Sequence, residues 1–411
     1  MTAAAQLDPF ARFVRERLFV AQAVEERRIG LEVEMLPFLA ESGAPCPLES
    51  DGEGGLSTLP FVRRYGESRG WREHRSPKGA PYFALPNGVT LTFEPGGQLE
   101  LCTSARSAIG VLIADTRRVL ADLRAAAADA GIELASVGID PHNDVAAVPL
   151  QLRSERYVKM TRYFDSIGPS GVRMMRQTAA TQVSLDAGSD PAGRWRLLAD
   201  ATPYLTAMFA NSPRYAGEDS GFRSFRARCW RLLDPSRTGV PHPELPAREA
   251  YARFAFDAVD MTRTTPNGEY RPFADWAADG HWNEAQWENH LSTLFPEVRP
   301  RGHLEVRSID AVPPEVLAAP VVLLAGLAYD DTAAAEARRL LPPADEDMLN
   351  GAARCSLRDS GIAMTASALV AVGLRGARAL GEQVIGGAEL ERAEDFFGRW
   401  TLRGRSPADD R

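Results

Sequence analysis

Four segments, far apart in this chain, alternate apolar residues with acids or amides. Successive side chains of a β-strand point to opposite faces of its sheet, so this pattern predicts strands with one buried and one polar face. A single strand on the solvent side of a sheet would show the same pattern. The four sets are Leu31, Val33 and Met35 against Glu32 and Glu34; Leu99 and Leu101 against Gln98, Glu100 and Cys102; Val183 and Leu185 against Gln182, Ser184 and Asp186; and Leu304 and Val306 against Glu305 and Arg307.

Because the pattern recurs, we expect the polar faces to line one cavity that holds metal ions and a nucleotide. The residues on these faces are Glu32 and Glu34, Glu94 and Glu100, Gln182 and Ser184, and Glu305 and Arg307. Burying five carboxylates together without cations would be strongly unfavourable, so this set predicts bound metal. Oxygen ligands without a histidine cluster or a thiolate pair favour Mg²⁺, two or more ions, over zinc. Arg307, beside Glu305, would stabilise charge on a transferring phosphoryl group.

Two other segments concentrate positive charge. Arg153–Phe164 has four basic residues on a helical pattern, and these suit either an anionic substrate or an ordinary solvated helix surface. Gly221–Arg231 has four arginines among three aromatic residues. Because arginine recognises carboxylate and phosphate groups with two hydrogen bonds, the second segment favours a small anionic substrate. An RNA-binding strip would need a second basic cluster of similar density.

Composition limits the partners. The net charge of −8 disfavours nucleic acid and anionic membranes, which need a basic protein surface. The four cysteines are scattered and suggest neither a disulfide framework nor a thiolate zinc site. The N-terminal residues lack the order of a signal peptide, and the longest apolar run, near 318–327, is too short to span a bilayer, so a cytoplasmic location is expected.

Several common catalytic motifs are absent from the sequence. It contains no GxxxxGK[ST] phosphate loop, no GxGxxG after a predicted strand and no GxSxG nucleophile elbow. The pattern therefore favours antiparallel strands that carry metal-binding acids over a doubly wound nucleotide-binding fold.

Four longer runs resemble successive motifs of a known family. They are FEPGGQLELCTS, MMRQTAATQVSLD, GFRSFRARCWRLLDPSRTG and WENHLSTLFPEVRPRGHLEVRSID, in that order between about Arg28 and Tyr329. They are similar to the plant-type glutamate–cysteine ligases and to the bacterial glutamate–cysteine ligases that feed ergothioneine synthesis.

The resemblance implies an α+β fold of the glutamine-synthetase type, a curved antiparallel sheet that forms a funnel with helices outside and Mg²⁺ and ATP within. It implies phosphorylation of the γ-carboxylate of glutamate by ATP and displacement of the phosphate by the amino group of cysteine. By this resemblance the metal ligands are Glu32, Glu34, Glu94, Glu100, Gln182 and Glu305. Ser184 would lie beside the nucleotide. Arg307 and Arg226 take catalytic roles, and the substrate contacts are Arg226, Trp230, Arg237, Thr238 and Thr178.

The chain also departs from the plant pattern. Ser184 stands where the plant enzymes have asparagine, and the plant redox cysteines have no counterpart. The acceptor pocket matches least, so a γ-glutamyl ligase with another amine acceptor stays open, as does a guanidino kinase on a related sheet. We expect a single catalytic domain over 1–411, with a core at about 28–330, a helical region at about 315–402 and a disordered tail at 404–411.

Overall fold

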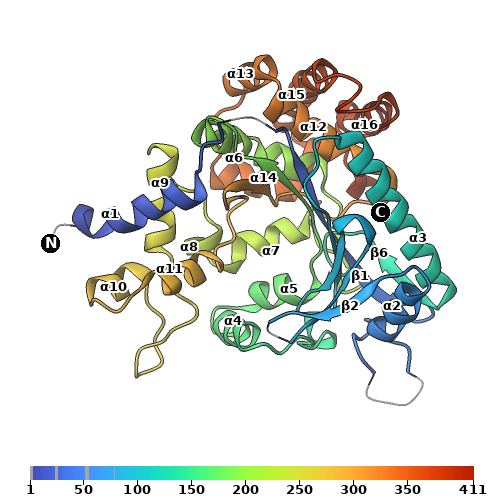
Figure 1. Ribbon diagram of the computed structural model, residues 1–411, viewed down its shortest axis with the longest axis horizontal. Coiled ribbons are helices and arrows are strands. Elements are labelled where there is room, and N and C mark those ends of the chain that lie inside the picture. The colour runs from blue at the N-terminus through green and yellow to red at the C-terminus, as the bar shows by residue number, and fades with distance from the viewer. Residues whose placement is uncertain (1–2, 24–25, 51–54, 78) are drawn as a thin grey trace.

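The described residues build one antiparallel sheet of nine strands, which runs through the middle of the molecule (Figure 1). The computed structural model describes residues 3–23, 26–50, 55–77 and 79–411. The strands are β1 Ile29–Leu39, β2 Arg72–Arg75, β3 Pro81–Ala84, β4 Thr90–Phe93, β5 Leu99–Cys102, β6 Ile132–Ala135, β7 Thr181–Asp186, β10 Val298–Pro300 and β11 His303–Val306. Their order is β10-β11-β7-β1-β5-β4-β3-β2, and β6 pairs with the second half of β1. A separate hairpin joins β8 Arg214–Tyr215 to β9 Glu218–Asp219.

The strand β1 is the centre of this sheet and sets its register. Glu34 lies opposite Glu100 of β5, and Glu32 lies opposite Gln182 of β7. On the next pair of strands, Ser184 lies opposite Glu305. Because facing residues of paired strands share a face, the predicted polar sets all fall on one side of the sheet.

The turn between β4 and β5 depends on two glycines. Gly97 has φ +89°, which side chains other than glycine rarely adopt. A Cβ on Gly96 would lie 2.0 Å from the carbonyl oxygen of Arg176, so the turn also needs glycine to approach the helix α5 (Pro169–Gln177). The turn therefore fixes Glu94 and Glu100 against the helical layer below the sheet.

Helices cover both faces of the sheet. They are α1 Ala3–Phe13, α2 Thr58–Glu67, α3 Ile109–Asp129, α4 Glu155–Asp165, α5 Pro169–Gln177, α6 Pro191–Met208, α7 Phe225–Leu233, α8 Pro235–Thr238, α9 Ala247–Asp257, α10 Phe273–Ala278, α11 Glu284–Leu291, α12 Ala318–Tyr329, α13 Asp331–Leu340, α14 Glu346–Cys355, α15 Ser360–Ala379 and α16 Gly387–Arg399. A π-helix, Val14–Leu18, continues α1. The predicted fold class, α+β with an antiparallel sheet enclosed by helices, is confirmed.

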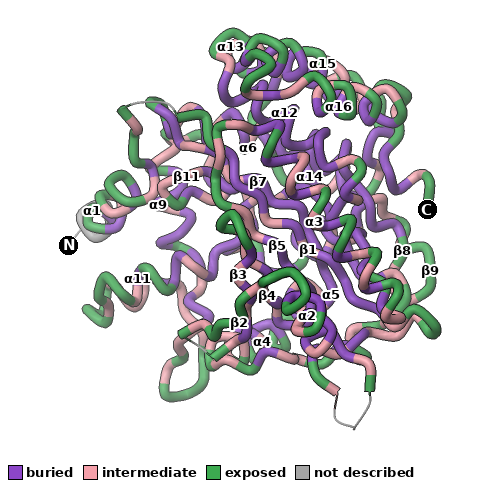
Figure 2. The backbone as a smooth tube through the Cα atoms, turned by 45° about the vertical axis from the view of Figure 1, so that its right-hand side comes forward, coloured by how far each residue is buried: buried purple, intermediate pink, exposed green. Residues whose placement is uncertain are grey.

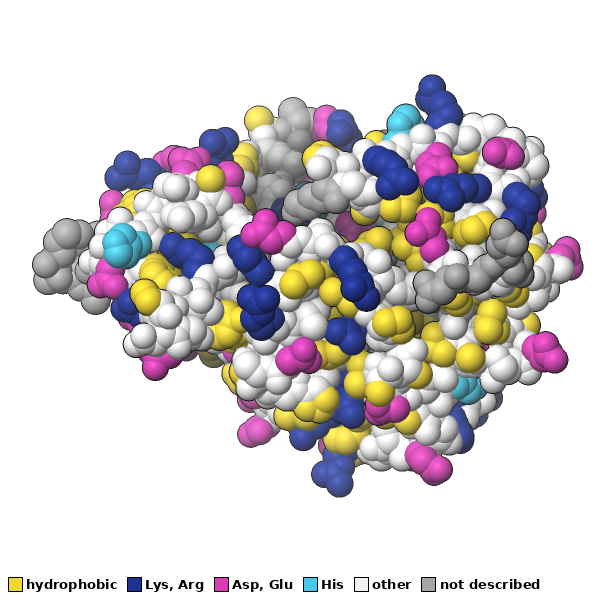
Figure 3. Space-filling view, turned by 90° about the horizontal axis from the view of Figure 1, so that it is seen from below, with side chains coloured by type: hydrophobic (Ala, Val, Ile, Leu, Met, Phe, Trp, Pro, Cys, Tyr) yellow, Lys and Arg dark blue, Asp and Glu magenta, His cyan; other side chains and the backbone are white. Residues whose placement is uncertain are grey.

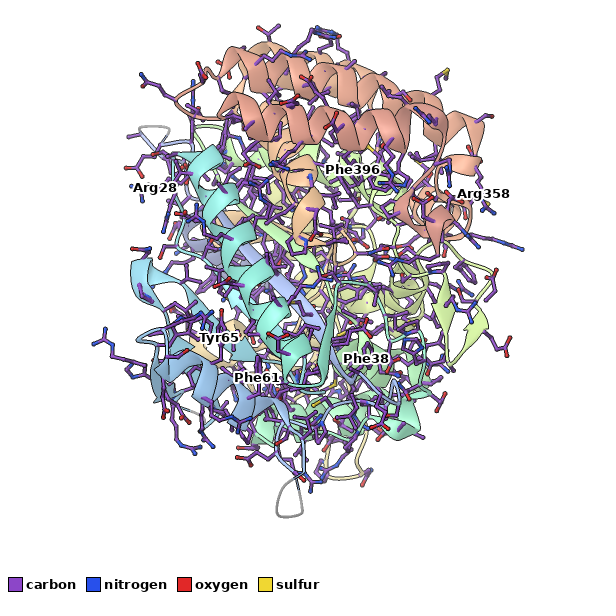
Figure 4. All side chains as sticks on the ribbon, turned by 90° about the vertical axis from the view of Figure 1, so that its right-hand side faces the viewer. Arg28, Phe38, Phe61, Tyr65, Arg358 and Phe396 are labelled. Carbon is purple, nitrogen blue, oxygen red and sulfur yellow. The ribbon has the colours of Figure 1, made fainter. Side chains whose placement is uncertain are left out.

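The apolar face carries the main core. Leu31, Val33 and Met35 of β1 are buried there, and the tube through the central strands is mostly buried (Figure 2). Every residue of α12 is buried, and it crosses α15 where Gly326 meets Gly373 so closely that a Cβ would clash with the facing carbonyl. Figure 4 shows α3 lying across this side of the sheet, with the C-terminal helices above it.

The polar face is closed by α4, α5 and α7. The sequence predicts one strand from Met174 to Asp186, but the structure forms α5 up to Gln177 and begins β7 at Thr181. Pro169 at the first helical position, after Gly168 with φ +130°, starts this helix. Met174 and Met175 consequently lie on a helix that covers the polar face.

The tail at 404–411 is folded, which corrects the expectation of disorder. Ser406, Pro407 and Ala408 are buried, and Ser406 and Asp409 form a capping box at the start of a short 3-10 helix. Asp409 accepts hydrogen bonds from Arg358, whose side chain is labelled in Figure 4. Polar composition suggested disorder, whereas ion pairs and an internal cap hold this segment in place.

Among the described residues, α15 alone has the length and composition of a membrane span by itself, and half of that stretch is buried inside the fold. The helical stretches Pro314–Tyr329 and Asp331–Leu340 would meet that criterion only together, and they are bent by 97°. All four cysteines are free.

Candidate active site

The polar face forms one wall of a cavity of about 200 Å³, which we call the central cavity. Five predicted metal ligands line it: Glu32, Glu34, Glu94, Glu100 and Gln182. The opposite wall comes from α4, α5 and α7 and includes Arg226, Trp230 and Thr178, which directly follows α5. Arg307, which directly follows β11, also lines the cavity. The structure therefore brings together residues from β1, β4, β5, β7 and the covering helices, as the alternating pattern predicts.

The carboxylates in this cavity repel one another. Burial, followed by repulsion from Glu100 and Glu305, raises the pKa of Glu32 to about 7. Burial and neighbouring carboxylates also raise the pKa of Glu94 well above its ordinary value, and those of Glu34 and Glu100 rise mainly through burial. Glu100 is buried, and Glu32, Glu34 and Glu94 are partly buried. Acids that are enclosed in this way and oppose each other's ionisation form a site that cations would stabilise.

Hydrogen bonds connect the acids to the arginines. Glu34 accepts from the backbone N–H of Ala180 at 2.8 Å and from the side-chain amide of Gln182 at 2.9 Å. The other end of that amide accepts from Arg307 at 2.7 Å. The amide of Gln182 thus has a fixed orientation, with its oxygen facing the arginine.

Glu305 lies below the cavity surface. Its side chain is fully buried and accepts hydrogen bonds from Arg307 and Arg299. Burial alone would raise the pKa of Glu305, but the charges of Arg307 and Arg299 lower it to about 2. The predicted metal ligand is therefore ionised and paired with two guanidinium groups.

Three arginines around the cavity have unused donors. The guanidinium of Arg226 lies 5.0 Å from the ring centre of Trp230 and donates to the backbone oxygen of Arg307 at 2.8 Å. Trp230 itself is held by a hydrogen bond from its indole to Phe295. The buried Nε atoms of Arg226, Arg299 and Arg307 have no acceptor among the described residues. Buried N–H groups without partners indicate that this wall is built for an anion.

A buried network holds Arg226 from behind. The carboxylate of Asp310 accepts from the Ser212 hydroxyl at 2.7 Å, the Ser224 hydroxyl at 2.9 Å and the Asn211 backbone at 2.9 Å. Arg226 lies 3.8 Å from the same carboxylate. Asp310 therefore places a carboxylate beside Arg226, and its hydrogen bonds fix the residues that surround this arginine.

Besides Glu305, three predicted site residues do not line the central cavity. Ser184 lines a neighbouring pocket of about 250 Å³, the Ser184 pocket, which shares Glu32 with the central cavity. Arg237 is fully buried elsewhere, and its nitrogens donate to Asp234, Thr293 and Val259.

Thr238 donates its hydroxyl to the Asp234 backbone and is buried beside Arg237. Arg237 and Thr238 are thus held by contacts within the protein and do not line the central cavity. Their substrate contacts stay a prediction.

Sequence reasoning missed two cavity arginines. Arg299 of β10 faces Glu305 across the β10–β11 pair, and burial followed by repulsion from Arg307 lowers its pKa to about 10. Arg156 belongs to the basic segment Arg153–Phe164 and lines the central cavity from α4. A hairpin that turns at Arg301-Gly302 places Arg299 opposite Glu305. This pairing could have identified Arg299 as a site residue from the sequence.

A third, larger space adjoins the central cavity. This outer chamber has a volume of about 580 Å³ and shares Glu94, Glu100, Arg156 and Tyr157 with the central cavity. The cavity acids therefore border two further spaces: Glu32 also lines the Ser184 pocket, and Glu94 and Glu100 also line the outer chamber.

The donor set fits Mg²⁺ by its chemistry. Carboxylate and amide oxygens are hard ligands. Burial, with repulsion between the carboxylates, raises the pKa of all four cavity acids, and a bound divalent ion would favour their charged forms. In the present side-chain positions, no three acids, histidines or cysteines of the described residues converge on one point as a coordination site does.

Comparison with known proteins agrees with the resemblance seen in the sequence motifs. The profile of glutamate–cysteine ligase family 2 (GCS2) matches residues 28–410. The chain is 36% identical over 347 residues to the glutamate–cysteine ligase EgtA of Mycolicibacterium smegmatis, covering 79% of this chain and 78% of that protein. It is 31% identical over 329 residues to the chloroplastic glutamate–cysteine ligase of Medicago truncatula, covering 74% of this chain and 61% of that protein.

The fold also has a counterpart among solved structures. The 2.0 Å crystal structure of the glutamate–cysteine ligase (gshA) of Francisella tularensis in complex with AMP aligns with a TM-score of 0.52 and 13% identity, covering 95% of this chain and 85% of that one. At this identity the likeness concerns the fold. The family match and the identity to EgtA carry the assignment, and the chain belongs to glutamate–cysteine ligase family 2.

Proposed function

We propose that this protein joins the γ-carboxylate of L-glutamate to the amino group of L-cysteine at the expense of ATP, giving γ-glutamylcysteine. One observation carries the proposal: carboxylates suited to cations and arginines suited to anions face each other across the central cavity. A phosphoryl-transfer site needs both, because positioned positive charge stabilises the transferring group.

Glutamate fits the wall formed by Arg226 and Trp230. The unused Nε–H of Arg226 offers a donor to a carboxylate, and the indole ring provides a flat apolar surface for the carbon chain. Arg307, between this wall and Glu305, is placed to meet negative charge on the γ-carboxylate as it is phosphorylated.

The nucleotide fits the Ser184 end of the polar face. The Ser184 pocket offers the hydroxyls of Ser184 and Thr103 and the backbone of Gly30, and it opens onto Glu32. Gly30 lies opposite Ser184 in the sheet and leaves the floor of this pocket free of a side chain.

The four cavity acids and Gln182 would hold two or more Mg²⁺ ions. Glu305 would become a further ligand once Arg299 and Arg307 donate their hydrogen bonds to phosphate instead. Bound there, Mg²⁺ would neutralise the phosphates of ATP. This chain's own residues orient the reactants: Arg226 holds glutamate, and Arg307 stabilises the transferring phosphoryl group.

The reaction follows in two steps. An oxygen of the γ-carboxylate attacks the terminal phosphorus of ATP, the bond from that phosphorus to the bridging oxygen breaks, and ADP leaves. The amine nitrogen then attacks the γ-carbon, the C–N bond forms and the C–O bond to phosphate breaks. Phosphate departs with the bonding electron pair, and the nitrogen releases a proton. We extend the proposal to the whole chain acting as one catalytic domain.

The test is incubation of the purified protein with ATP, Mg²⁺, glutamate and a panel of amines, with phosphate release and ligated product measured together. Product and phosphate with cysteine are expected, and both should disappear when a chelator removes Mg²⁺. Product with another amine but not with cysteine would reassign the acceptor. A phosphorylated guanidine without ligation would overturn the ligase assignment.

A further inference from the structure

A fourth space adjoins the central cavity at the end of β10. This basic pocket has a volume of about 290 Å³, and its lining includes Arg17, Arg299 and Arg301. Arg17 comes from the π-helix after α1, and two further walls come from α9 and α11, which lie on the left in Figure 1. Seen from below, that side of the surface mixes basic and acidic side chains (Figure 3). Neither the glutamate wall nor the Ser184 pocket uses Arg17 or Arg301.

Only side chains separate the basic pocket from the central cavity at two points. Arg299 lines both spaces. Ser292, which lines the basic pocket, accepts a hydrogen bond at 2.9 Å from Arg156, which lines the central cavity. Because an arginine side chain can change its rotamer while the backbone stays in place, Arg299 can open this boundary without a movement of β10.

Glu305 is shared by three guanidinium groups at this boundary. Its carboxylate lies 2.9 Å from Arg299 and 3.8 Å from Arg301, and Arg307 contacts it as well. The buried Nε of Arg299 has no acceptor among the described residues. When Glu305 turns to a bound cation, as proposed above, Arg299 and Arg301 lose their common carboxylate. This end of the basic pocket then favours an anion.

Two acids moderate the positive charge of the pocket. Glu288 lines it, and Glu284 pairs with Arg17 at 3.6 Å. Both acids are exposed, and so are Arg17 and Arg301, so water screens these charges more than it screens the charge of Arg299. The pocket therefore suits an anion that passes through with low affinity.

We propose that the basic pocket is the route by which inorganic phosphate leaves the enzyme. The inference rests on the proposed ligase function. When the C–O bond to phosphate breaks, phosphate takes the bonding electron pair and is left beside Arg307 and Arg299, which both line the central cavity. Arg299 also lines the basic pocket, so a change of its rotamer carries the anion towards Arg301 and Arg17.

This route separates the two products that contain phosphate. ADP is assigned to the Ser184 pocket, which shares no lining residue with the basic pocket. Phosphate can therefore leave while ADP is still bound. Because guanidinium groups recognise the terminal phosphate of ADP as well as free phosphate, the test measures both ligands.

The first measurement is the equilibrium binding of radiolabelled inorganic phosphate to the protein with saturating Mg²⁺ and ADP. The wild type should bind phosphate. Arg301→Gln and Arg17→Gln should each raise the Kd for phosphate by about fivefold and leave the Kd for ADP unchanged. Both side chains are more than half exposed, at 55% and 65%, so the variants should keep the urea midpoint of the wild type.

Two neighbouring variants sharpen this measurement. Glu288→Gln removes a negative charge from the lining and should lower the Kd for phosphate by about threefold. Arg15 lies on the same π-helix as Arg17, pairs with Glu16 and does not line the basic pocket. Arg15→Gln should therefore bind phosphate like the wild type, although it removes the same charge as Arg17→Gln.

A rapid-mixing experiment tests the release itself. Ligated product is measured after an acid quench, and free phosphate is followed with a fluorescent phosphate-binding reporter. In the wild type, product and free phosphate should appear together. In the double variant Arg17→Gln with Arg301→Gln, product should form at the wild-type rate in the first turnover, while free phosphate appears at least about fivefold more slowly.

Several results would overturn the inference. Unchanged phosphate affinity in Arg17→Gln and Arg301→Gln would place bound phosphate elsewhere, and a wild type that binds no phosphate would remove the site. A raised Kd for ADP in place of phosphate would assign the basic pocket to the nucleotide. Phosphate that appears together with product in the double variant would refute the release route. Failure of the wild type to ligate any amine would instead refute the proposed function on which the route rests.

Discussion

Arg299 and Glu305 face each other across the β10–β11 pair, and one guanidinium nitrogen of Arg299 donates to both carboxylate oxygens, at 2.9 and 3.0 Å. Arg307 contacts the same carboxylate from the other side. Glu305 is thus the shared counter-ion of two nearly buried arginines. It holds the phosphate-facing part of the site together in addition to its proposed role at the metal.

Replacing Glu305 should therefore affect both stability and activity. Glu305→Ala leaves two buried guanidinium groups without their partner and should lower the free energy of unfolding by about 3–5 kcal/mol. Glu305→Gln keeps the shape and one acceptor oxygen, so it should lose less stability while still losing most activity. Urea unfolding and the ligation assay measure the two effects. Unchanged unfolding of the alanine variant would refute the counter-ion role.

Changes to Asp310 should act through Arg226. Asp310→Asn places an amide among three hydrogen-bond donors and removes the charge near Arg226. We expect kcat/KM for glutamate to fall by about tenfold or more, with the KM for ATP nearly unchanged. Ser212→Ala removes one of these donors and the acceptor of the Arg226 backbone N–H, but it keeps the charge of Asp310, so it should have a smaller effect. A larger rise in the KM for ATP than for glutamate would contradict this assignment.

Arg237 should prove structural. Arg237→Gln breaks a fully buried ion pair with Asp234 and should lower the free energy of unfolding by about 3–5 kcal/mol, while the KM for glutamate of the folded fraction stays the same. The control is Arg375→Gln, because the exposed pair of Arg375 with Glu336 should contribute less than about 1 kcal/mol. A selective rise in the KM for glutamate would show that Arg237 contacts the substrate after all.

The same ion pair predicts a pH dependence. Burial alone would raise the pKa of Asp234, but Arg237 and hydrogen bonds from Tyr163 and Ser236 lower it below its ordinary value of 3.8. A carboxyl group with a lowered pKa in the folded state stabilises the fold above the unfolded-state pKa and loses this effect as pH falls through the folded-state pKa.

The stability cost of Asp234→Asn should therefore be full at about pH 6 and shrink below about pH 4. Urea midpoints of the wild type and the variant, compared across this range, measure it. A difference that stays constant across the range would mean that the charge of Asp234 adds nothing.

The strand faces were predictable from the sequence because a strand repeats every two residues. Alternation alone places Glu32 and Glu34 on the face opposite Val33, and the β4–β5 turn brings Glu100 to the same side. What could not be predicted is which polar residues point inward from helices. Arg226 and Arg237 belong to one sequence motif, GFRSFRARCWRLLDPSRTG, yet only Arg226 lines the central cavity.

Tertiary pairing explains the other differences. Arg299 enters the site through the register of a short hairpin, and its partner Glu305 lies six residues further along the chain. The tail is ordered by distant groups such as Arg358, which no local pattern reveals. The Ser184 pocket and the outer chamber arise from loops and helix ends that the strand pattern does not describe.

The docked tail also has a practical consequence. Arg411 donates to the side-chain oxygen of Asn211 at 2.6 Å, and the amide nitrogen of Asn211 donates to the backbone oxygens of Ser136 and Ala311. Through its own backbone N–H, Asn211 reaches the Asp310 carboxylate behind Arg226. Loss of the Arg411 side chain would therefore remove one support of Asn211 and loosen the network behind Arg226, although Arg411 does not line the central cavity.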